Sequence, residues 1–144
     1  MFEYPAKFDD DNAEGGFGVT FPEFPEAVTR GESLNESMEM ARDSLSMAIA
    51  YRIEKTESVP APSKRKGKNF RLAGLSAIHD AKSALYQLRH ASGMRKVEFA
   101  RRLGIQPPNA DRFFRFDRST QVDQLEAAFA AFGKRLVISV EDAA

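Results

Sequence analysis

The sequence of 144 residues contains no cysteine. This absence excludes disulfides and thiolate metal ligands, and it suits the reducing conditions of the cytoplasm, where we expect the protein to be located. Long hydrophobic runs are also missing, since none approaches the roughly 20 residues that a membrane-spanning helix needs. The N-terminus lacks a basic stretch followed by an apolar one, so we predict neither a secretion signal nor an association with membranes.

Catalytic signatures are equally scarce. His79 and His90 are the only histidines, and on one helix they would lie about 16 Å apart, too far to share a metal ion within one chain. The acidic residues between positions 9 and 14 lie in a predicted hairpin loop without the spacing of a calcium-binding loop. No phosphate-binding loop, dinucleotide fingerprint, nucleophile elbow or zinc-protease motif occurs. We therefore predict no catalytic site, no metal site and no cofactor.

The net charge of zero hides an uneven distribution along the chain. Residues 1–58 contain 5 Lys and Arg against 13 Asp and Glu, whereas residues 59–144 contain 16 against 8. A basic half suits a polyanion such as nucleic acid, and an acidic half suits a basic partner. The alternative is that both halves carry only ordinary solvated charges.

Alternating apolar residues predict a β-hairpin at the N-terminus. Residues 2–8 and 17–21 both follow the period of two that is typical of half-buried strands. The connection at residues 9–16 is polar and ends in two glycines, which tolerate the positive φ of a tight return. A short third strand is expected at residues 27–29.

A long helix is predicted after these strands. Ser33 and Glu36 have the spacing of a capping box, and apolar residues then recur at steps of three and four up to Glu54. A short strand at residues 70–72 is expected to complete the first sheet. The chain is thereby divided into an N-terminal lobe of residues 1–63, a basic linker with the last strand at residues 64–76, and a C-terminal lobe of residues 77–144.

Helical periodicity dominates the C-terminal lobe. Glycine at positions 93 and 104 favours left-handed helix ends, and Thr120 with Asp123 suggests the cap of a helix that runs to position 133. The expected helices cover residues 77–92, 96–103, 108–116 and 120–133. A final strand at residues 136–140 is expected to pair across a dimer axis.

Residues 96–115 have the spacing of a helix-turn-helix. Small Ala100 lies where the two helices would cross, and Gly104 lies where the chain reverses. If residues 108–116 form the recognition helix, Asn109 and Arg112 lie on its outer face, where they suit paired hydrogen bonds to adenine and guanine. Phosphate contacts are expected from Lys96, Gln106, Arg115 and Arg118. The alternative is a small helical bundle with a basic face.

Two sets of motifs resemble the HicB family of antitoxins. The first set resembles the N-terminal domain of that family and consists of Tyr4-Pro5, Gly15-Gly16-Phe17, Phe21-Pro22, Pro25, Thr29-Arg30-Gly31-Glu32-Ser33 and Pro60-Ala61-Pro62-Ser63. The second set resembles the Cro/repressor-like helix-turn-helix of one HicB branch and consists of residues 96–115, Val122-Asp123-Gln124-Leu125 and Phe132-Gly133-Lys134-Arg135-Leu136. Together these motifs cover nearly the whole chain.

The resemblance implies an α+β fold with a partial RNase H-like N-terminal lobe, built from an antiparallel sheet and a helix, and an all-helical C-terminal lobe. It also implies that the first lobe blocks HicA, a small basic toxin that cleaves RNA, and that the complex represses its own operon by binding operator DNA as a dimer or higher oligomer. Candidate toxin contacts lie in a predicted turn and on the outer face of the long helix: Glu23, Phe24, Pro25, Glu26, Glu36, Glu39 and Asp43.

Two other functions remain open from the sequence. The first is a DNA-binding transcriptional regulator whose N-terminal lobe senses a small ligand. The second is a metal-dependent nuclease that uses the acidic residues of the first lobe.

Overall fold

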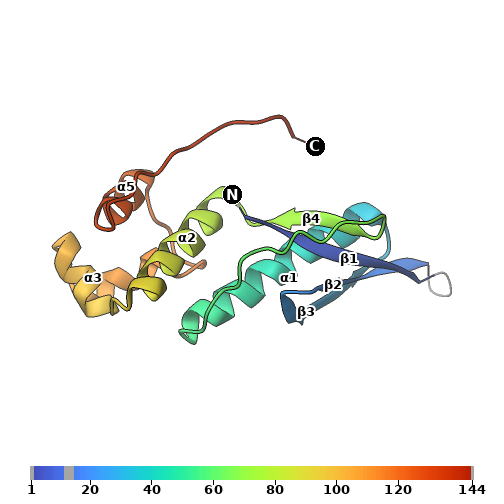
Figure 1. Ribbon diagram of the computed structural model, residues 1–144, viewed down its shortest axis with the longest axis horizontal. Helices are drawn as coiled ribbons and strands as arrows, with labels where there is room; N and C mark the ends of the chain where they lie inside the picture. The colour runs from blue at the N-terminus through green and yellow to red at the C-terminus, as the bar shows by residue number, and fades with distance from the viewer. Residues whose placement is uncertain (1, 12–14, 144) are drawn as a thin grey trace.

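The computed structural model describes residues 2–11 and 15–143. A four-stranded antiparallel sheet and one long helix form the N-terminal part, and a group of shorter helices forms the C-terminal part (Figure 1). The predicted α+β class is confirmed at this level. None of the helices in the described ranges is both long and apolar enough to cross a membrane.

The predicted hairpin is confirmed. β1 (Glu3–Asp11) pairs antiparallel with β2 (Gly16–Phe21), with Lys7 opposite Thr20. β1 is longer than expected, because its pairing continues to Asp11. The backbone of residues 9–11 therefore belongs to a strand, and the prediction that the whole acidic cluster lies in a loop was wrong. The remaining acidic residue of that cluster, Glu14, lies outside the described residues.

The third strand is also longer than predicted. β3 (Phe24–Gly31) follows a turn that contains only Pro22 and Glu23. The predicted turn at residues 23–26 was therefore wrong, because Phe24 already belongs to the strand and is fully buried, with its ring 5.1 Å from that of Tyr4. Burial of this aromatic side chain favours strand pairing over a polar turn.

β4 (Phe70–Gly74) pairs antiparallel with β1 and gives the sheet the order β3-β2-β1-β4. This confirms the expectation that the short strand after the basic linker completes the first sheet. Both β3 and β4 are edge strands, and Leu72 on β4 is 57% exposed.

The long helix α1 (Leu34–Glu54) has the predicted bounds. The Ser33 hydroxyl accepts a hydrogen bond from the backbone N–H of Glu36 at 3.1 Å, which satisfies one of the free donors of the first turn. Ala41 and Leu45 lie on the face that packs against the sheet, mainly against β3, and both are fully buried. The steps of three and four in the sequence thus correspond to the buried face of α1.

The C-terminal helices largely follow the predicted order. They are α2 (Ala77–Ser92), α3 (Lys96–Leu103), α4 (Pro107–Ala110), the short 3-10 helix η1 (Asp111–Phe113) and α5 (Val122–Ala130). Gly93 and Gly104 end α2 and α3 with φ values of 75° and 67°, as predicted for left-handed caps.

Two expectations about this lobe were wrong. Regular helix does not extend over residues 108–116, since α4 gives way to η1, which ends at Phe113. α5 is capped by Gln121 and Gln124, because the hydroxyl of Thr120 instead donates to the carbonyl of Arg112 at 3.1 Å. Residues 136–140 pair with no described strand of this chain, and the expected pairing across a dimer axis stays a prediction.

The buried side chains form one hydrophobic cluster that extends from the sheet to the last helix. Tyr4 and Phe21 contribute from the sheet, Leu45 from α1, Leu85 from α2 and Leu125 from α5, and each is at most 2% exposed. The two lobes are therefore joined by a continuous core rather than by a flexible linker alone.

Candidate nucleic-acid and protein-binding surfaces

The segment from α3 to η1 brings two short helices together at a tight turn. Ala100 is 1% exposed, which leaves no room for a larger side chain where the helices meet. The left-handed Gly104 reverses the chain, and the N–H of Ile105 then donates to the carbonyl of Ala100 at 3.0 Å. The steric roles predicted for Ala100 and Gly104 agree with this geometry.

Four of the candidate DNA-binding residues form no ion pair with another described residue, and they differ in accessibility. Gln106 and Asn109 are exposed at the start of α4, and Arg118 is exposed in the loop after η1. Arg112 is only half-buried, and its Nε atom is shielded from solvent without a hydrogen-bond partner among the described residues. Asn109 is therefore better exposed than Arg112 for contact with a base edge.

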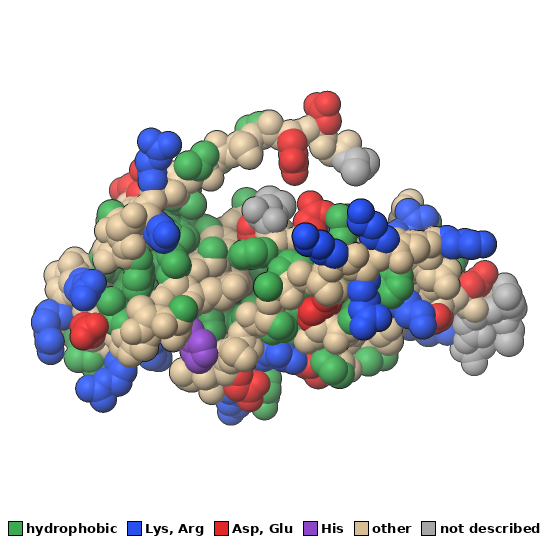
Figure 2. Space-filling view, viewed as in Figure 1, with side chains coloured by type: hydrophobic (Ala, Val, Ile, Leu, Met, Phe, Trp, Pro, Cys, Tyr) green, Lys and Arg blue, Asp and Glu red, His purple; other side chains and the backbone are tan. Residues whose placement is uncertain are grey.

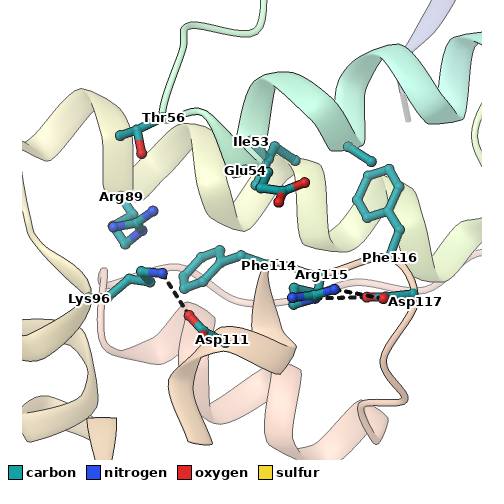
Figure 3. A pocket seen from close by; sticks show the side chains of 11 residues that line it. Ile53, Glu54, Thr56, Arg89, Lys96, Asp111, Phe114, Arg115, Phe116 and Asp117 are labelled. Atoms are coloured by element: carbon teal, nitrogen blue, oxygen red, sulfur yellow. Dashed lines mark hydrogen bonds and ion pairs between the residues drawn. The ribbon is translucent and has the colours of Figure 1, made fainter. Parts of the chain in front are cut away.

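Lys96 and Arg115 instead line a groove between the C-terminal helices and the end of α1 (Figure 3). The Lys96 ammonium lies 2.7 Å from Asp111, and the Arg115 guanidinium donates twice to Asp117, at 2.9 and 2.8 Å. Arg115 lowers the pKa of Asp117 to about 2. Both cations are thus partly neutralised inside a groove of about 320 Å³.

Lys82 is a buried cation whose role the sequence analysis missed. It lies on α2 with no exposed surface, and its ammonium donates to the carbonyls of Arg115 and Arg118, at 2.6 and 2.5 Å. Burial lowers its pKa. These bonds hold the backbone of the loop after η1, which carries both arginines. The spacing of Ile78, Lys82 and Tyr86 at steps of four was the available signal for an inward-facing cation.

Two further side chains hold the same loop against the core. The ring of His79 stacks on that of Phe116 at 4.3 Å, and its Nδ1 and Nε2 atoms lie 3.3 Å from the Ser46 hydroxyl and 3.1 Å from the Phe116 carbonyl. Arg89 lies with its guanidinium 4.5 Å from the ring centre of Phe114, and burial lowers its pKa. The loop after η1 is therefore fixed by α1 and α2.

An acidic groove lies between α1 and the edge strand β3. Val28, Met40 and Met47 are 65%, 40% and 73% exposed there, and Glu26 and Asp43 also line the groove, whose volume is about 380 Å³. The carboxylate of Glu26 accepts two hydrogen bonds from Arg52 at 2.7 and 3.1 Å, which lower its pKa. Exposed apolar side chains beside carboxylates suit a partner that is both apolar and basic.

The other candidate toxin contacts have different environments. Pro25 and Glu39 are exposed, but Phe24 is fully buried and presents no side chain to a partner. Glu23 accepts a hydrogen bond from the Ser63 N–H at 2.7 Å, and Glu36 accepts one from the Glu32 N–H at 3.2 Å. Glu23 and Glu36 therefore have structural roles within this lobe.

No group of three or more His, Cys, Asp or Glu residues in the described part of the chain is arranged to hold a metal ion. This holds for Asp9 and Asp10 of the acidic cluster that the nuclease alternative would require, whereas the side chains of Asp11 and Glu14 are not described.

Comparison with known families gives an identification for the N-terminal lobe. A family model described as "HicB_like antitoxin of bacterial toxin-antitoxin system" matches residues 3–84, more than half of the chain. The chain belongs to this HicB antitoxin family. Its members are antitoxins rather than enzymes, and the match extends from β1 into α2.

Curated HicB antitoxins match beyond this lobe. Antitoxin HicB 2 of Photorhabdus laumondii is 35% identical over 133 residues, which cover 92% of each chain. Antitoxin HicB of Escherichia coli K12 is 35% identical over 124 residues, or 85% of this chain and 88% of the relative. Antitoxin HicB of Pseudomonas fluorescens is 29% identical over 143 residues, or 99% of this chain and 97% of the relative. The similarity therefore includes the C-terminal helices.

Proposed function

We propose that this HicB-family chain binds and sterically blocks a HicA-like, RNA-cleaving toxin through its N-terminal lobe. We further propose that it represses its own operon by binding operator DNA through its C-terminal lobe, as a dimer or higher oligomer. Membership of an antitoxin family is the observation that carries the proposal, because it assigns the role while the surfaces described above suggest where each partner binds.

The groove between α1 and β3 is the proposed toxin-binding surface. Its exposed Met40 and Met47 offer adaptable apolar contacts, and Asp43 adds a carboxylate with no ion pair to another described residue. A basic toxin would bury the methionines while its cations approach Asp43, so the groove can supply both affinity and orientation. Glu39 and Pro25 lie on the same lobe and are the proposed flanking contacts.

The segment from α3 to η1 is the proposed DNA-binding element, in the manner of a Cro/repressor-like helix-turn-helix. Exposed Asn109 and the half-exposed Arg112 are the proposed base contacts, and Gln106 and Arg118 the proposed phosphate contacts. Lys96 and Arg115 would have to exchange their carboxylate partners for phosphates, so their contribution to affinity is expected to be smaller. We also infer that the sheet order β3-β2-β1-β4 with α1 on one face is a partial RNase H-like fold.

The toxin-binding proposal is tested by expressing the chain with the small basic protein that we expect its neighbouring gene to encode. We expect the two proteins to purify together, and the chain to suppress RNA cleavage by the partner in proportion to its concentration. Asp43→Lys should raise the concentration needed for half inhibition at least tenfold, because it introduces like charge against a basic partner.

Asp10→Lys is the matched control, since it makes the same charge change at an exposed position on β1, in the same lobe. It should leave inhibition within about twofold of the unmodified chain, as expected of a surface change away from the interface. A similar loss in both variants would indicate general electrostatic attraction rather than a defined groove. Absence of any basic partner would contradict the antitoxin assignment.

A further inference from the structure

The segment that leads into β4 carries the densest run of cations in the chain. Five Lys and Arg residues lie within eight positions, and no Asp or Glu occurs between Glu57 and Asp80. All five side chains are exposed, and none of them forms an ion pair with another described residue. We call this surface the basic edge, and it consists of Lys64, Arg65, Lys66, Lys68 and Arg71.

The basic edge belongs to a lobe that is otherwise acidic, since residues 1–58 contain 13 Asp and Glu against 5 Lys and Arg. Figure 2 shows Lys and Arg side chains gathered over the end of the molecule where Figure 1 places β4. β3 and β4 are opposite edges of the sheet, so the basic edge lies away from the acidic groove between α1 and β3. The lobe therefore presents two surfaces of opposite charge, which suit different partners.

Apolar surface lies among these cations. Phe70 on β4 is half-buried and Leu72 is 57% exposed, and neither belongs to the hydrophobic cluster of the described residues. Together with Lys64, Lys66 and Arg71 they line a hollow of about 390 Å³, and no Asp or Glu is among the described residues that line it. Charged side chains alone are enough to protect an edge strand from unwanted pairing, so protection of β4 does not explain the apolar hollow between them.

Cations without carboxylate partners around a half-exposed aromatic ring are typical of surfaces that bind single-stranded nucleic acid. The cations attract phosphates, while the ring offers a face on which an unpaired base stacks. A duplex keeps its bases inside the stack, so it would leave Phe70 and Leu72 without a contact. Unpaired strands are supplied in a cell chiefly by RNA, because DNA is held as a duplex. The chemistry of the basic edge therefore favours single-stranded RNA.

We propose that the basic edge binds single-stranded RNA, with its cations on the phosphates and Phe70 against one base. This activity goes beyond the proposed function, which assigns a toxin to the groove at β3 and duplex DNA to the C-terminal lobe. Binding of RNA requires neither of these partners. Only its consequence rests on the proposed function, because RNA held at β4 would stay on the antitoxin while an RNA-cleaving toxin occupies the opposite edge of the sheet.

The phosphate contacts are tested by fluorescence anisotropy of the full chain with a labelled oligouridine of about eight nucleotides, short enough to cover one such surface. K64Q/R65Q should weaken binding at least fivefold. The slope of log affinity against log salt should become shallower by about 1.4, since each lost contact to a single strand removes about 0.7. K134Q/R135Q is the matched control, because it changes the same exposed dipeptide after α5, and it should leave the affinity within about twofold.

The base contact is tested separately with F70L, which keeps an apolar side chain on β4 but removes the ring. This variant should weaken binding of the oligouridine at least threefold, because a base stacks on an aromatic face but not on leucine. Its salt dependence should equal that of the unmodified chain, since no cation is lost. Binding of a scrambled DNA duplex should be the same in F70L and the unmodified chain, and circular dichroism checks that the variant is folded.

Four results would overturn the inference. Equal losses in K64Q/R65Q and K134Q/R135Q would indicate general electrostatic attraction, and unchanged RNA affinity in F70L would leave phosphate contacts alone. An equal loss of K64Q/R65Q on the scrambled duplex would assign the basic edge to duplex DNA. Tighter binding of an oligodeoxyuridine of the same length would assign it to single-stranded DNA. RNA binding is measured without toxin or operator, so its failure would leave the proposed function intact.

Discussion

At the scale of single residues, Lys82 links α2 to the loop after η1. A cation without exposed surface is costly unless its donors are satisfied, and here two carbonyls of the loop after η1 accept hydrogen bonds from its ammonium. The pKa of Lys82 is lowered by burial, so the charged form is retained at a cost, and the hydrogen bonds to the loop are the compensation. Lys82 therefore couples α2 to the backbone that carries Arg115 and Arg118.

Replacement of Lys82 by methionine should destabilise the fold by about 1–3 kcal/mol or more, because removing the ammonium leaves partly buried carbonyls without a donor. Lys96→Met is the matched control, since it removes a lysine of the same length from an exposed ion pair worth at most about 1 kcal/mol. Urea unfolding followed by circular dichroism measures both. Equal and small losses would mean that solvent replaces the Lys82 ammonium without cost.

The raised pKa of Tyr4 predicts that the fold loses stability at alkaline pH. Its hydroxyl donates to the carbonyl of Pro60 at 2.7 Å, and burial, followed by the nearby charge of Glu23, raises its pKa to about 12. Because this pKa is above the ordinary value of about 10, the neutral phenol stabilises the fold below pH 10, and this contribution is lost as the pH rises through 12.

The free energy of unfolding of the unmodified chain should therefore fall more steeply between pH 10 and pH 12 than that of Tyr4→Phe. Urea midpoints at half-unit pH steps measure the difference, and the late-titrating phenol should also disappear from the absorbance titration of the variant. Parallel stability curves for the two proteins would show that ionisation of Tyr4 is not linked to unfolding.

At the scale of elements, the short α4 and η1 limit how DNA can be contacted. A helix of four residues followed by a 3-10 turn presents fewer side chains to a groove than the regular helix expected from the sequence. Asn109 lies at its exposed start, while Arg115 is held by Asp117 in the groove beside α1. Base recognition is therefore expected from the first turn of α4.

Substitutions in this element should separate base contacts from phosphate contacts. Asn109→Ala and Arg112→Ala should each weaken binding to the cognate operator by about 1–3 kcal/mol with little change on a scrambled duplex. Arg118→Ala should weaken both and flatten the salt dependence by roughly one unit. Arg115→Ala should have a smaller effect than Arg118→Ala, because Asp117 competes with phosphate for its guanidinium.

The measurement is the affinity for cognate and scrambled duplexes across a salt series. Inhibition of the toxin should be unchanged in all four variants, which serves as the control for correct folding. Equal losses on both duplexes for Asn109→Ala would remove α4 from the role of base recognition.

At the scale of the whole molecule, α2 joins the two lobes. The hydroxyl of Tyr86 on α2 donates to the carbonyl of Glu57 at 2.6 Å, and His79 lies 3.3 Å from Ser46 on α1. β4 precedes α2 directly and completes the sheet beside β1. The first lobe is therefore supported by residues that the sequence analysis assigned to the linker and to the second lobe.

Truncated chains should show this dependence. A fragment of residues 1–63 lacks β4 and leaves the buried β1 without a neighbour on one edge, so it should show no cooperative thermal transition. Residues 1–76 restore the sheet, and residues 1–92 add Leu85 and Tyr86 of α2, which are fully buried. The melting temperature should rise in that order by circular dichroism. A fragment of residues 1–63 as stable as that of residues 1–92 would show that the lobes are independent.

Local rules were sufficient for much of this fold. The hairpin follows from period-two alternation, and α1 follows from the cap at Ser33 and the steps of three and four up to Glu54. The left-handed conformations at Gly93 and Gly104 follow from the position of glycine at a helix end. Each of these features depends on interactions within a few residues, and such interactions are encoded by neighbouring positions in the chain.

Tertiary structure decided the features that depend on distant partners. The ring of Phe24 packs against Tyr4 from a neighbouring part of the sheet, and Lys82, about 30 residues upstream, binds the loop that follows η1. Among the candidate site residues, the exposure of Asn109 could be predicted from the sequence. The ion pair between Arg115 and Asp117 could not. Burial and ion pairing depend on which side chains are in contact in the folded protein. The periodicity of apolar residues indicates the face on which a side chain lies, but not which distant side chain it contacts.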